Sequence, residues 1–331
     1  MKIKEMISAY SSMVFGKNDY WHPEMVASSD IKENKIGEYY VDTRAKSEYP
    51  GKYDENEIPL VNINGEDTYI PVTIAQYALG NYDRFIDTSD IKYIQIVKKC
   101  ADWFVNNIIE LGSNNKGYVH NNNQEIYKIH APWFSALAQA QAISVLSRYY
   151  NYSEDKKYLD SALELLKSFE VNVANGGIFN LLNDNYFYEE YPSKIPSYVL
   201  NGFIFSLWGL LDLYIVSNDS KAKELYDKGV TTLKSNIHLY NIELLDWSRY
   251  DLYPFKINNI TSIFYHKLHV EQLKAMYSLT NLEVFKLYYT KWEKASKNII
   301  KYLIATSYKV VHKLTVAKGS SYVPSIKNDK K

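Results

Sequence analysis

The chain has 331 residues, with 38 Lys and Arg against 38 Asp and Glu, and 46% of its residues are hydrophobic. These values predict two domains or one large repeat-built domain with a sizeable core, and they exclude wholesale disorder. The net charge is zero, so the chain has no excess of the basic residues that bind a phosphate backbone. Nucleic acid is therefore not an expected partner. The single cysteine, Cys100, excludes an intramolecular disulfide and a cysteine-based metal site.

Aromatic residues make up 15% of the chain, and 32 of them are Tyr. An A/T-rich genome is one explanation, because it enriches Tyr, Asn, Lys and Ile together. A sugar-binding groove is another, since amphipathic rings stack on sugars and a phenol adds a hydrogen bond. Composition alone leaves both explanations open.

Residues 1–72 predict a segment rich in β-structure and turns. Two β-like runs, 39–42 and 68–72, flank a stretch that contains several Pro and Gly residues. The start of the chain has basic residues but no sustained apolar run and no small-residue cleavage site. We therefore expect no targeting signal and a cytoplasmic protein.

Residues 73–312 predict a succession of amphipathic helices, in which apolar residues recur at the three- and four-residue steps of one helical face. Pro132 suits the first turn of a helix, and Asp155 and Asn218 suit helix caps. The predicted helices are 73–87, 91–111, 132–150, 156–173, 197–217, 221–238, 262–279 and 283–308.

A long segment rich in Gly, Asn and Tyr follows every second predicted helix, at 112–130, 175–196 and 240–261. This spacing predicts about four helix hairpins, which must stack to bury their apolar faces. Since no strict repeat period is visible, we expect a mainly α fold, a closed α/α barrel or toroid. The long loops would then gather at one rim, where functional residues are commonly found. Residues 313–331 are expected to form a flexible tail.

The most apolar run, 199–216, approaches the length of a membrane span but contains Asn201 and Asp212. Polar residues of this kind are costly in a bilayer. We therefore expect a buried core helix here and no membrane span.

A first candidate motif is 186–192 (YFYEEYP), in which Glu189 and Glu190 stand among four aromatic residues. Burial beside such rings would raise the pKa of a carboxyl group towards that of a useful base. A solvated turn with ordinary charges is the alternative interpretation.

Two further motifs follow. The loop segment 247–255 (WSRYDLYPF) carries Arg249 and Tyr250, and the next predicted helix carries His266 and His269 on one face. Without a third ligand or an HExxH pattern, a substrate-facing His with a structural partner is favoured over a metal site. The sequence contains no P-loop, dinucleotide fingerprint or nucleophile elbow, so no cofactor is expected.

These motifs resemble the C-terminal catalytic domain of the glucuronyl C5-epimerase family. The resemblance covers about residues 118–297, and the spacing of its EEYP and VLNGF blocks is the most specific part. It implies an α/α barrel with β-rich N-terminal material. The matching strings are PWFSALAQAQAISVLSRYY (132–150), YEEYPSKIPSYVLNGFIFSLWGLLDLY (188–214), WSRYDLYPF (247–255) and YHKLHVEQL (265–273).

The resemblance implies an epimerase that inverts C5 of D-glucuronic acid residues in heparosan-like polysaccharides, giving L-iduronic acid. The family's catalytic Glu-Tyr pair matches Glu190 and Tyr191. Two later essential tyrosines match Tyr250 and Tyr265. The substrate-binding Asn of the VLNGF block matches Asn201.

One position departs from the family pattern. Vertebrate members have Arg after the YDL string, whereas this sequence has Tyr253, with Arg249 close by as a substrate-binding candidate. The resemblance further implies an acidic, glucuronic-acid-containing polysaccharide as partner, and homodimerisation. The chain shows no membrane anchor like that of the animal enzymes, which suggests an intracellular prokaryotic relative.

Inversion at C5 removes a proton next to a carboxylate and returns one on the opposite face, so it needs two acid–base groups. We assign these roles to Glu190 and Tyr265, with Tyr191, Tyr250 and His266 bonding the carboxylate or tuning the pair. Because hydrogen moves as a proton, no redox cofactor is needed. Members of the family can carry a structural cation, but the sequence shows no dedicated loop for one, so no metal is expected. The alternatives are a uronate polysaccharide lyase, which instead expels the C4 substituent, and a non-catalytic glycan-binding protein.

Overall fold

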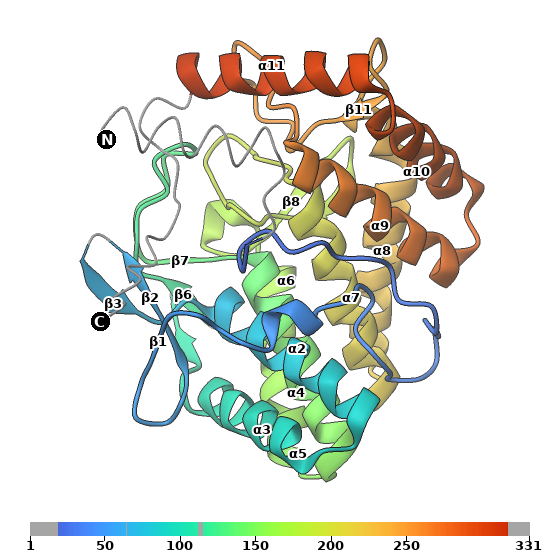
Figure 1. Ribbon diagram of the computed structural model, residues 1–331. Helices are drawn as coiled ribbons and strands as arrows, with labels where there is room; N and C mark the ends of the chain where they lie inside the picture. The colour runs from blue at the N-terminus through green and yellow to red at the C-terminus, as the bar shows by residue number, and fades with distance from the viewer. Residues whose placement is uncertain (1–18, 64, 112–114, 317–331) are drawn as a thin grey trace, which may run out of the picture.

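The computed structural model describes residues 19–63, 65–111 and 115–316, and over these residues the protein is mainly helical (Figure 1). The predicted mainly α class is therefore confirmed. Of the predicted tail, residues 317–331 lie outside the described residues, while Lys313 belongs to the last turns of a helix.

The predicted β-containing segment precedes the helices as a small antiparallel sheet. Its strands, paired in chain order, are β1 (Lys52–Tyr53), β2 (Pro59–Ile63) and β3 (Glu66–Thr68). The strand predicted at 68–72 is wrong beyond Thr68, because Pro71 begins a helix, where the fixed φ of proline suits the first turn. In the run 39–42, Val41 forms an isolated bridge with Ala27.

The helices form consecutive pairs. Within each pair the two helices pack on each other, as α2 does on α3, α4 on α5, α7 on α8 and α9 on α10. The first helices of successive pairs also pack together, α2 on α4, α4 on α7 and α7 on α9. The helices are α2 (Pro71–Thr88), α3 (Ile91–Asn106), α4 (Ala136–Ser153), α5 (Lys156–Glu164), α6 (Leu166–Glu170), α7 (Leu200–Ser217), α8 (Ser220–Asn236), α9 (Ile263–Thr280), α10 (Glu283–Ser296) and α11 (Ile299–Thr315).

Short two-stranded sheets occupy the loops between helix pairs. These are β4 (Ile109–Glu110) with β5 (Lys116–Gly117), β6 (Val119–His120) with β7 (Trp133–Phe134), β8 (Phe179–Leu182) with β9 (Asn185–Tyr188), and β10 (Asn241–Ile242) with β11 (Trp247–Ser248). The last two sheets brace the loops that carry the candidate site.

Helix α7 is long and apolar enough to cross a membrane, but most of it is buried inside the protein. It packs closely on α4, where Gly209 is necessary because a Cβ there would collide with the backbone of Ala140. The buried run of 199–216 is thus a core helix, as expected.

The polar residue in this helix, Asp212, is paired. Its carboxylate accepts a hydrogen bond at 2.5 Å from Arg148 of α4 and one at 2.9 Å from the Tyr40 hydroxyl. Arg148 and Asp212 are both fully buried. The pair therefore joins two central helices to the N-terminal segment.

Several predicted helix boundaries were wrong. The predicted helix 283–308 is two helices, because Asn298 accepts hydrogen bonds from the first free backbone N–H groups of α11 and starts a new helix. The predicted helix 91–111 ends at Asn106 and is followed by strand β4. Pro132 lies before β7, and the helix begins only at Ala136.

The two predicted caps had different outcomes. Asp155 caps α5 by accepting a hydrogen bond from the N–H of Lys157, as expected. Asn218 instead ends α7 in a left-handed conformation, which Asn tolerates better than most residues. The cap of α8 is Asp219.

Candidate active site

Glu189 and Glu190 follow strand β9 directly, and their carboxylates have different surroundings. Glu189 is fully buried, and its Oε2 accepts hydrogen bonds from the Ser197 hydroxyl at 2.6 Å and the Tyr198 N–H at 3.0 Å. These contacts fold the loop between β9 and α7 back on itself. Glu189 is therefore a structural carboxylate.

Glu190 lies against the first turn of α7. Its Oε2 accepts a hydrogen bond from the Asn201 side chain at 3.2 Å, and a Cβ added at Gly202 would collide with the carboxylate. Burial raises the pKa of Glu190 to about 7, although hydrogen bonds from Tyr191, Asn201 and the Gly202 backbone oppose the rise. A carboxyl group with this pKa can exchange a proton near neutral pH.

Three tyrosines surround Glu190. Tyr191 interacts electrostatically with Glu190 and Tyr250, and Tyr250 interacts in the same way with Tyr265. The rings of Tyr250 and Tyr265 meet edge-on, with 4.9 Å between centroids. We call Glu190 with these three residues the tyrosine cluster.

The phenols of the tyrosine cluster are weak acids. Burial, followed by the nearby Glu190 carboxylate, raises the pKa of Tyr191, Tyr250 and Tyr265 above the ordinary value. All three rings remain partly exposed to solvent. The cluster therefore offers neutral hydroxyls, as donors or acids, beside one titratable carboxyl group.

A second layer supports these tyrosines. The Tyr127 ring stacks on Tyr191 with 4.8 Å between centroids, and its hydroxyl donates a 2.6 Å hydrogen bond to Asp251. Asn259 donates a second 2.6 Å hydrogen bond to the same carboxylate oxygen. Tyr253 is 9% exposed and packs on Tyr127, with 5.4 Å between ring centroids, so it belongs to this aromatic packing.

A known family matches the part of the chain that carries this cluster. The family described as D-glucuronyl C5-epimerase C-terminus matches residues 113–294. This is more than half of the chain and includes the whole tyrosine cluster. The chain belongs to the D-glucuronyl C5-epimerase family. The resemblance drawn from the sequence motifs is therefore confirmed.

Individual relatives agree with this assignment. The D-glucuronyl C5-epimerase of Caenorhabditis elegans is 35% identical over 207 residues, which cover 58% of this chain and 33% of the relative. An uncharacterised protein of Methanocaldococcus jannaschii is 31% identical over 171 residues, which cover 50% of this chain and 54% of that protein. The chain thus spans about a third of the nematode relative and about half of the archaeal one.

Among solved structures, a cellobiose 2-epimerase from Bacillus thermoamylovorans B4167 is similar to this C5-epimerase family member. Its TM-score is 0.49 at 13% sequence identity, and the match covers 73% of this chain and 65% of that chain.

His266 does not join the tyrosine cluster of this C5-epimerase family member. Its ring is fully buried and stacks on Trp247 with 3.9 Å between centroids. Its Nδ1 accepts the N–H of Ser248 at 3.1 Å, and its Nε2 donates to the carbonyl of Trp292 at 3.0 Å. Because both ring nitrogens are occupied and burial lowers its pKa to about 3, His266 is a neutral structural residue. The predicted role of His266 in binding substrate stays a prediction, and its contacts in this structure are with the core.

Arg249 lies beside the second layer. Its guanidinium is half-buried near Asp251, Tyr240 and Tyr308 of α11, and burial lowers its pKa. Its backbone forms a bridge with Ile260, which holds the loop that carries Tyr250. Its role as a substrate ligand stays a prediction.

The sequence motifs missed three residues near this site, Tyr127, Lys309 and His22. Asp251 stands in the candidate motif 247–255, and Tyr127 lies in a loop segment noted for its tyrosines, so those patterns carried a signal. Lys309 of α11 carried none, yet its Nζ lies 5.9 Å from the centre of the Tyr250 ring. His22 of the N-terminal segment lies 6.4 Å from the Tyr265 ring, between centroids.

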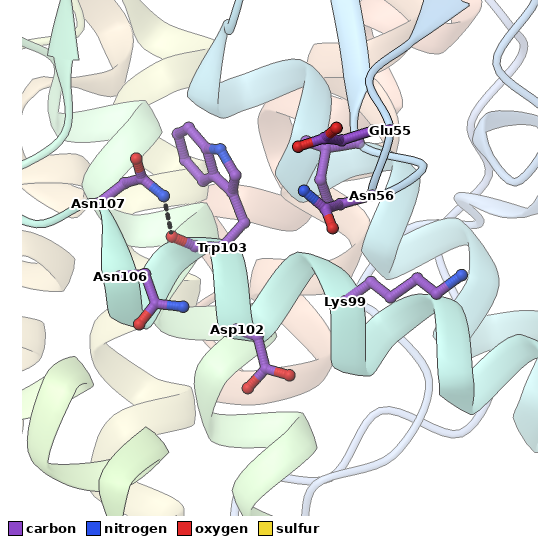
Figure 2. Close-up of a pocket in the computed structure, with 8 residues that line it drawn as sticks. Glu55, Asn56, Lys99, Asp102, Trp103, Asn106 and Asn107 are labelled. Atoms are coloured by element: carbon purple, nitrogen blue, oxygen red, sulfur yellow. Dashed lines mark hydrogen bonds between the residues drawn. The ribbon is translucent and has the colours of Figure 1, made fainter.

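A cavity of about 410 Å³ opens between the β1–β2 turn and α3, and shares no lining residue with the tyrosine cluster. Figure 2 shows Trp103 of α3 with Glu55 and Asn56 of the turn nearby. Lys99, which lines the cavity, forms a 2.5 Å ion pair with Glu57. We assign this cavity no role in the chemistry.

Metal ligands do not gather in the described part of the chain. Within residues 19–63, 65–111 and 115–316, no three His, Cys, Asp or Glu side chains come together in a group that could hold an ion. The described acidic and imidazole groups of the candidate site are instead bonded to Tyr, Asn, Ser or backbone partners.

Proposed function

We propose that this protein is a polysaccharide uronate epimerase that inverts C5 of D-glucuronic acid residues to L-iduronic acid. The observation that carries the proposal is the buried Glu190 carboxyl group, bonded to Asn201, with a pKa raised to about 7 and with three neutral tyrosines around it. Membership of the D-glucuronyl C5-epimerase family supports it. The substrate is an acidic polysaccharide that contains glucuronic acid.

The first step is proton abstraction. The hydrogen at C5 of a uronate is a very weak acid, because removing it places charge next to an existing carboxylate. Donors aimed at the carboxylate oxygens stabilise the resulting enediolate. Glu190 takes the proton, while the hydroxyls of Tyr191 and Tyr250 donate hydrogen bonds to those oxygens.

The second step is reprotonation from the opposite face. Tyr265 delivers this proton, since it is a second neutral phenol of the tyrosine cluster and its ring meets that of Tyr250 edge-on. Its phenolate recovers a proton through Tyr250 or from solvent. In the reverse direction, the two groups exchange roles as acid and base.

The proposal also includes the overall fold, the cellular location and the oligomeric state of the protein. The helix pairs form an α/α toroid with the tyrosine cluster at its rim, and the protein works in the cytoplasm, where it can dimerise. The reaction uses no redox cofactor because hydrogen moves as a proton.

The decisive experiment is proton NMR of a glucuronic-acid polymer incubated with the protein in deuterium oxide. Epimerisation removes the glucuronate H5 signal and gives iduronate resonances. A new 4,5-double-bond signal would instead identify a lyase. Polymer binding without any loss of H5 would identify a glycan-binding protein.

A matched pair of variants connects the result to the site. Tyr265→Phe removes one hydroxyl from the tyrosine cluster and is expected to abolish the formation of iduronate. Tyr152→Phe removes a hydroxyl from an exposed tyrosine of α4 and is expected to leave the rate unchanged. Equal rates in both variants contradict the role of Tyr265.

A further inference from the structure

The tyrosine cluster lacks a positive charge of its own. Glu190 and, behind it, Asp251 are acidic, while the three tyrosines are neutral. A uronate brings a further negative charge into this partly buried place, where charge repulsion is strong. A cation beside the tyrosines would remove that penalty.

Helix α11 brings a lysine to this place. The helix lies across one end of the molecule, over the loop that follows β11 (Figure 1). Two of its side chains bind that loop, with Lys309 donating to the Asn259 side chain at 2.6 Å and His312 to the Ile257 carbonyl at 2.9 Å. Helix α11 lies outside the residues that match the family.

The lysine and the tyrosine cluster share Asn259. The carbonyl of Asn259 accepts the N–H of Tyr250 at 2.7 Å, and its side chain connects Lys309 to Asp251. The Lys309 Nζ also lies 5.9 Å from the centre of the Tyr250 ring. An ammonium group has three donors, and Asn259 accepts one of them.

We propose that Lys309 binds the carboxylate of the uronate whose C5 is inverted, and so makes the site specific for acidic sugars. This inference rests on the proposed function. The ammonium on α11 neutralises the carboxylate before proton abstraction and holds it beside the hydroxyl of Tyr250. A salt bridge in this partly desolvated place also fixes the orientation of the sugar ring.

The charged groups around Lys309 set its protonation. Burial and the neighbouring Lys313 lower its pKa to about 7, while Asp251 opposes this shift. The lysine is therefore cationic below about pH 7 and loses its charge as the pH rises. The groups that face it are Arg249, Tyr250 and Asp251 from the loop and His312 and Lys313 from α11.

The test compares the binding of two oligosaccharides by calorimetry, a glucuronate oligomer and the same oligomer with its carboxyl groups reduced to alcohols. Lys309→Met is expected to weaken binding of the acidic oligomer at least about tenfold, the usual cost of one charge-assisted hydrogen bond. Binding of the reduced oligomer should not change. Lys309→Arg should restore part of the preference.

A lysine on the same helix provides the control. Lys301 pairs with Asp246 at 2.8 Å, two turns before Lys309. Lys301→Met is expected to keep the wild-type preference for the acidic oligomer. Circular dichroism and thermal melting verify that each variant is folded.

The pH dependence of binding provides a second measurement, made in a Glu190→Gln background because Glu190 also titrates near pH 7. The affinity for the acidic oligomer should fall as the pH rises through about 7, and the affinity for the reduced oligomer should stay level. A flat profile for the acidic oligomer overturns the proposal, even if Lys309→Met fails to fold.

The outcomes separate this inference from the proposed function. A folded Lys309→Met protein with wild-type preference overturns the inference, and so does a wild type that binds both oligomers equally or binds neither. A wild type that prefers the acidic oligomer through Lys309, but exchanges no C5 hydrogen, contradicts only the epimerase function.

Discussion

At the scale of single residues, burial alone does not separate the two adjacent glutamates. Burial raises the pKa of Glu189 and of Glu190 to about 7. Their partners make the difference, because Glu189 is bonded to Ser197 and the Tyr198 backbone, whereas Glu190 is bonded to the Asn201 side chain. Of the two, Glu190 is the one that acts electrostatically on Tyr191, Tyr250 and Tyr265.

Glu190→Gln is expected to reduce the rate of C5 hydrogen exchange by about a hundred- to ten-thousand-fold, the usual contribution of a general base. The amide keeps the size of the side chain but cannot accept the proton. Exchange into deuterium oxide, followed by NMR, measures the effect. Near-normal exchange in a folded variant would falsify the role of Glu190.

The pH dependence of kcat, measured at saturating substrate, should report the same carboxyl group. Because the pKa of Glu190 is raised, the basic form is present only as the pH rises through about 7, so activity should increase across that range. Asn201→Ala removes a hydrogen bond that favours the charged form of Glu190. The variant is therefore expected to shift the rise in activity to higher pH.

Asn107→Ala is a suitable control for this profile, since Asn107 bonds to the backbone of Trp103 on α3, outside the site. Asn107→Ala should leave the pH at which activity rises unchanged. A shift of that rise to lower pH in Asn201→Ala would contradict its assignment to Glu190.

At the scale of elements, the first turn of α7 positions the base. Asn201 and Gly202 both contact the Glu190 carboxylate, and Val199 before them makes no side-chain cap. The loop carboxylate therefore takes the place where a helix favours negative charge. Helix α7 and the Glu190 carboxylate therefore stabilise each other.

Gly202→Ala should displace the Glu190 carboxylate, because the new Cβ would collide with it. We expect about a hundredfold lower kcat, the usual cost of a misplacement of about 1 Å. Alanine has the higher helix propensity, by about 1 kcal/mol, so propensity alone does not predict unfolding. Steady-state kinetics together with thermal melting separate the two effects.

Gly37→Ala provides the comparison, since a Cβ at that position would meet no atom within 4 Å. Its kcat should equal that of the wild type. Unchanged kcat in Gly202→Ala would show that the carboxylate can move without loss of function.

At the scale of the whole molecule, a buried ion pair connects two central helices to the N-terminal segment. Arg148 of α4, Asp212 of α7 and Tyr40 of the N-terminal segment meet in the core. Removing one member of a buried ion pair leaves the other charge without compensation. The core thus depends on the complete set.

Asp212→Ala is expected to lower the free energy of unfolding by about 3–5 kcal/mol, because Arg148 stays buried and charged. Chemical denaturation measures the loss. Replacing both residues, as Arg148→Met with Asp212→Leu, should recover much of it. The exposed pair Lys223–Asp227 on α8 is the control, since Asp227→Ala should cost less than about 1 kcal/mol.

Local sequence patterns were enough to predict the helical class, most helix positions and the family. Apolar periodicity is local, so a pattern such as that of 91–106 predicts a helix without knowledge of its neighbours. The motif around Glu190 and Tyr191 likewise identified the family from residues that are close in the chain. Boundaries were less accurate, because caps such as Asn298 and Asp219 compete with periodicity.

The tertiary structure alone decided which side chains meet. It placed His266 in the core, separated Glu189 from Glu190, and brought Lys309 beside Tyr250 from a helix that no motif marked. These outcomes depend on the direction of each side chain and on contacts between segments far apart in the chain. Packing and hydrogen-bond satisfaction fix such contacts only when the whole fold is formed, so no local pattern could predict them.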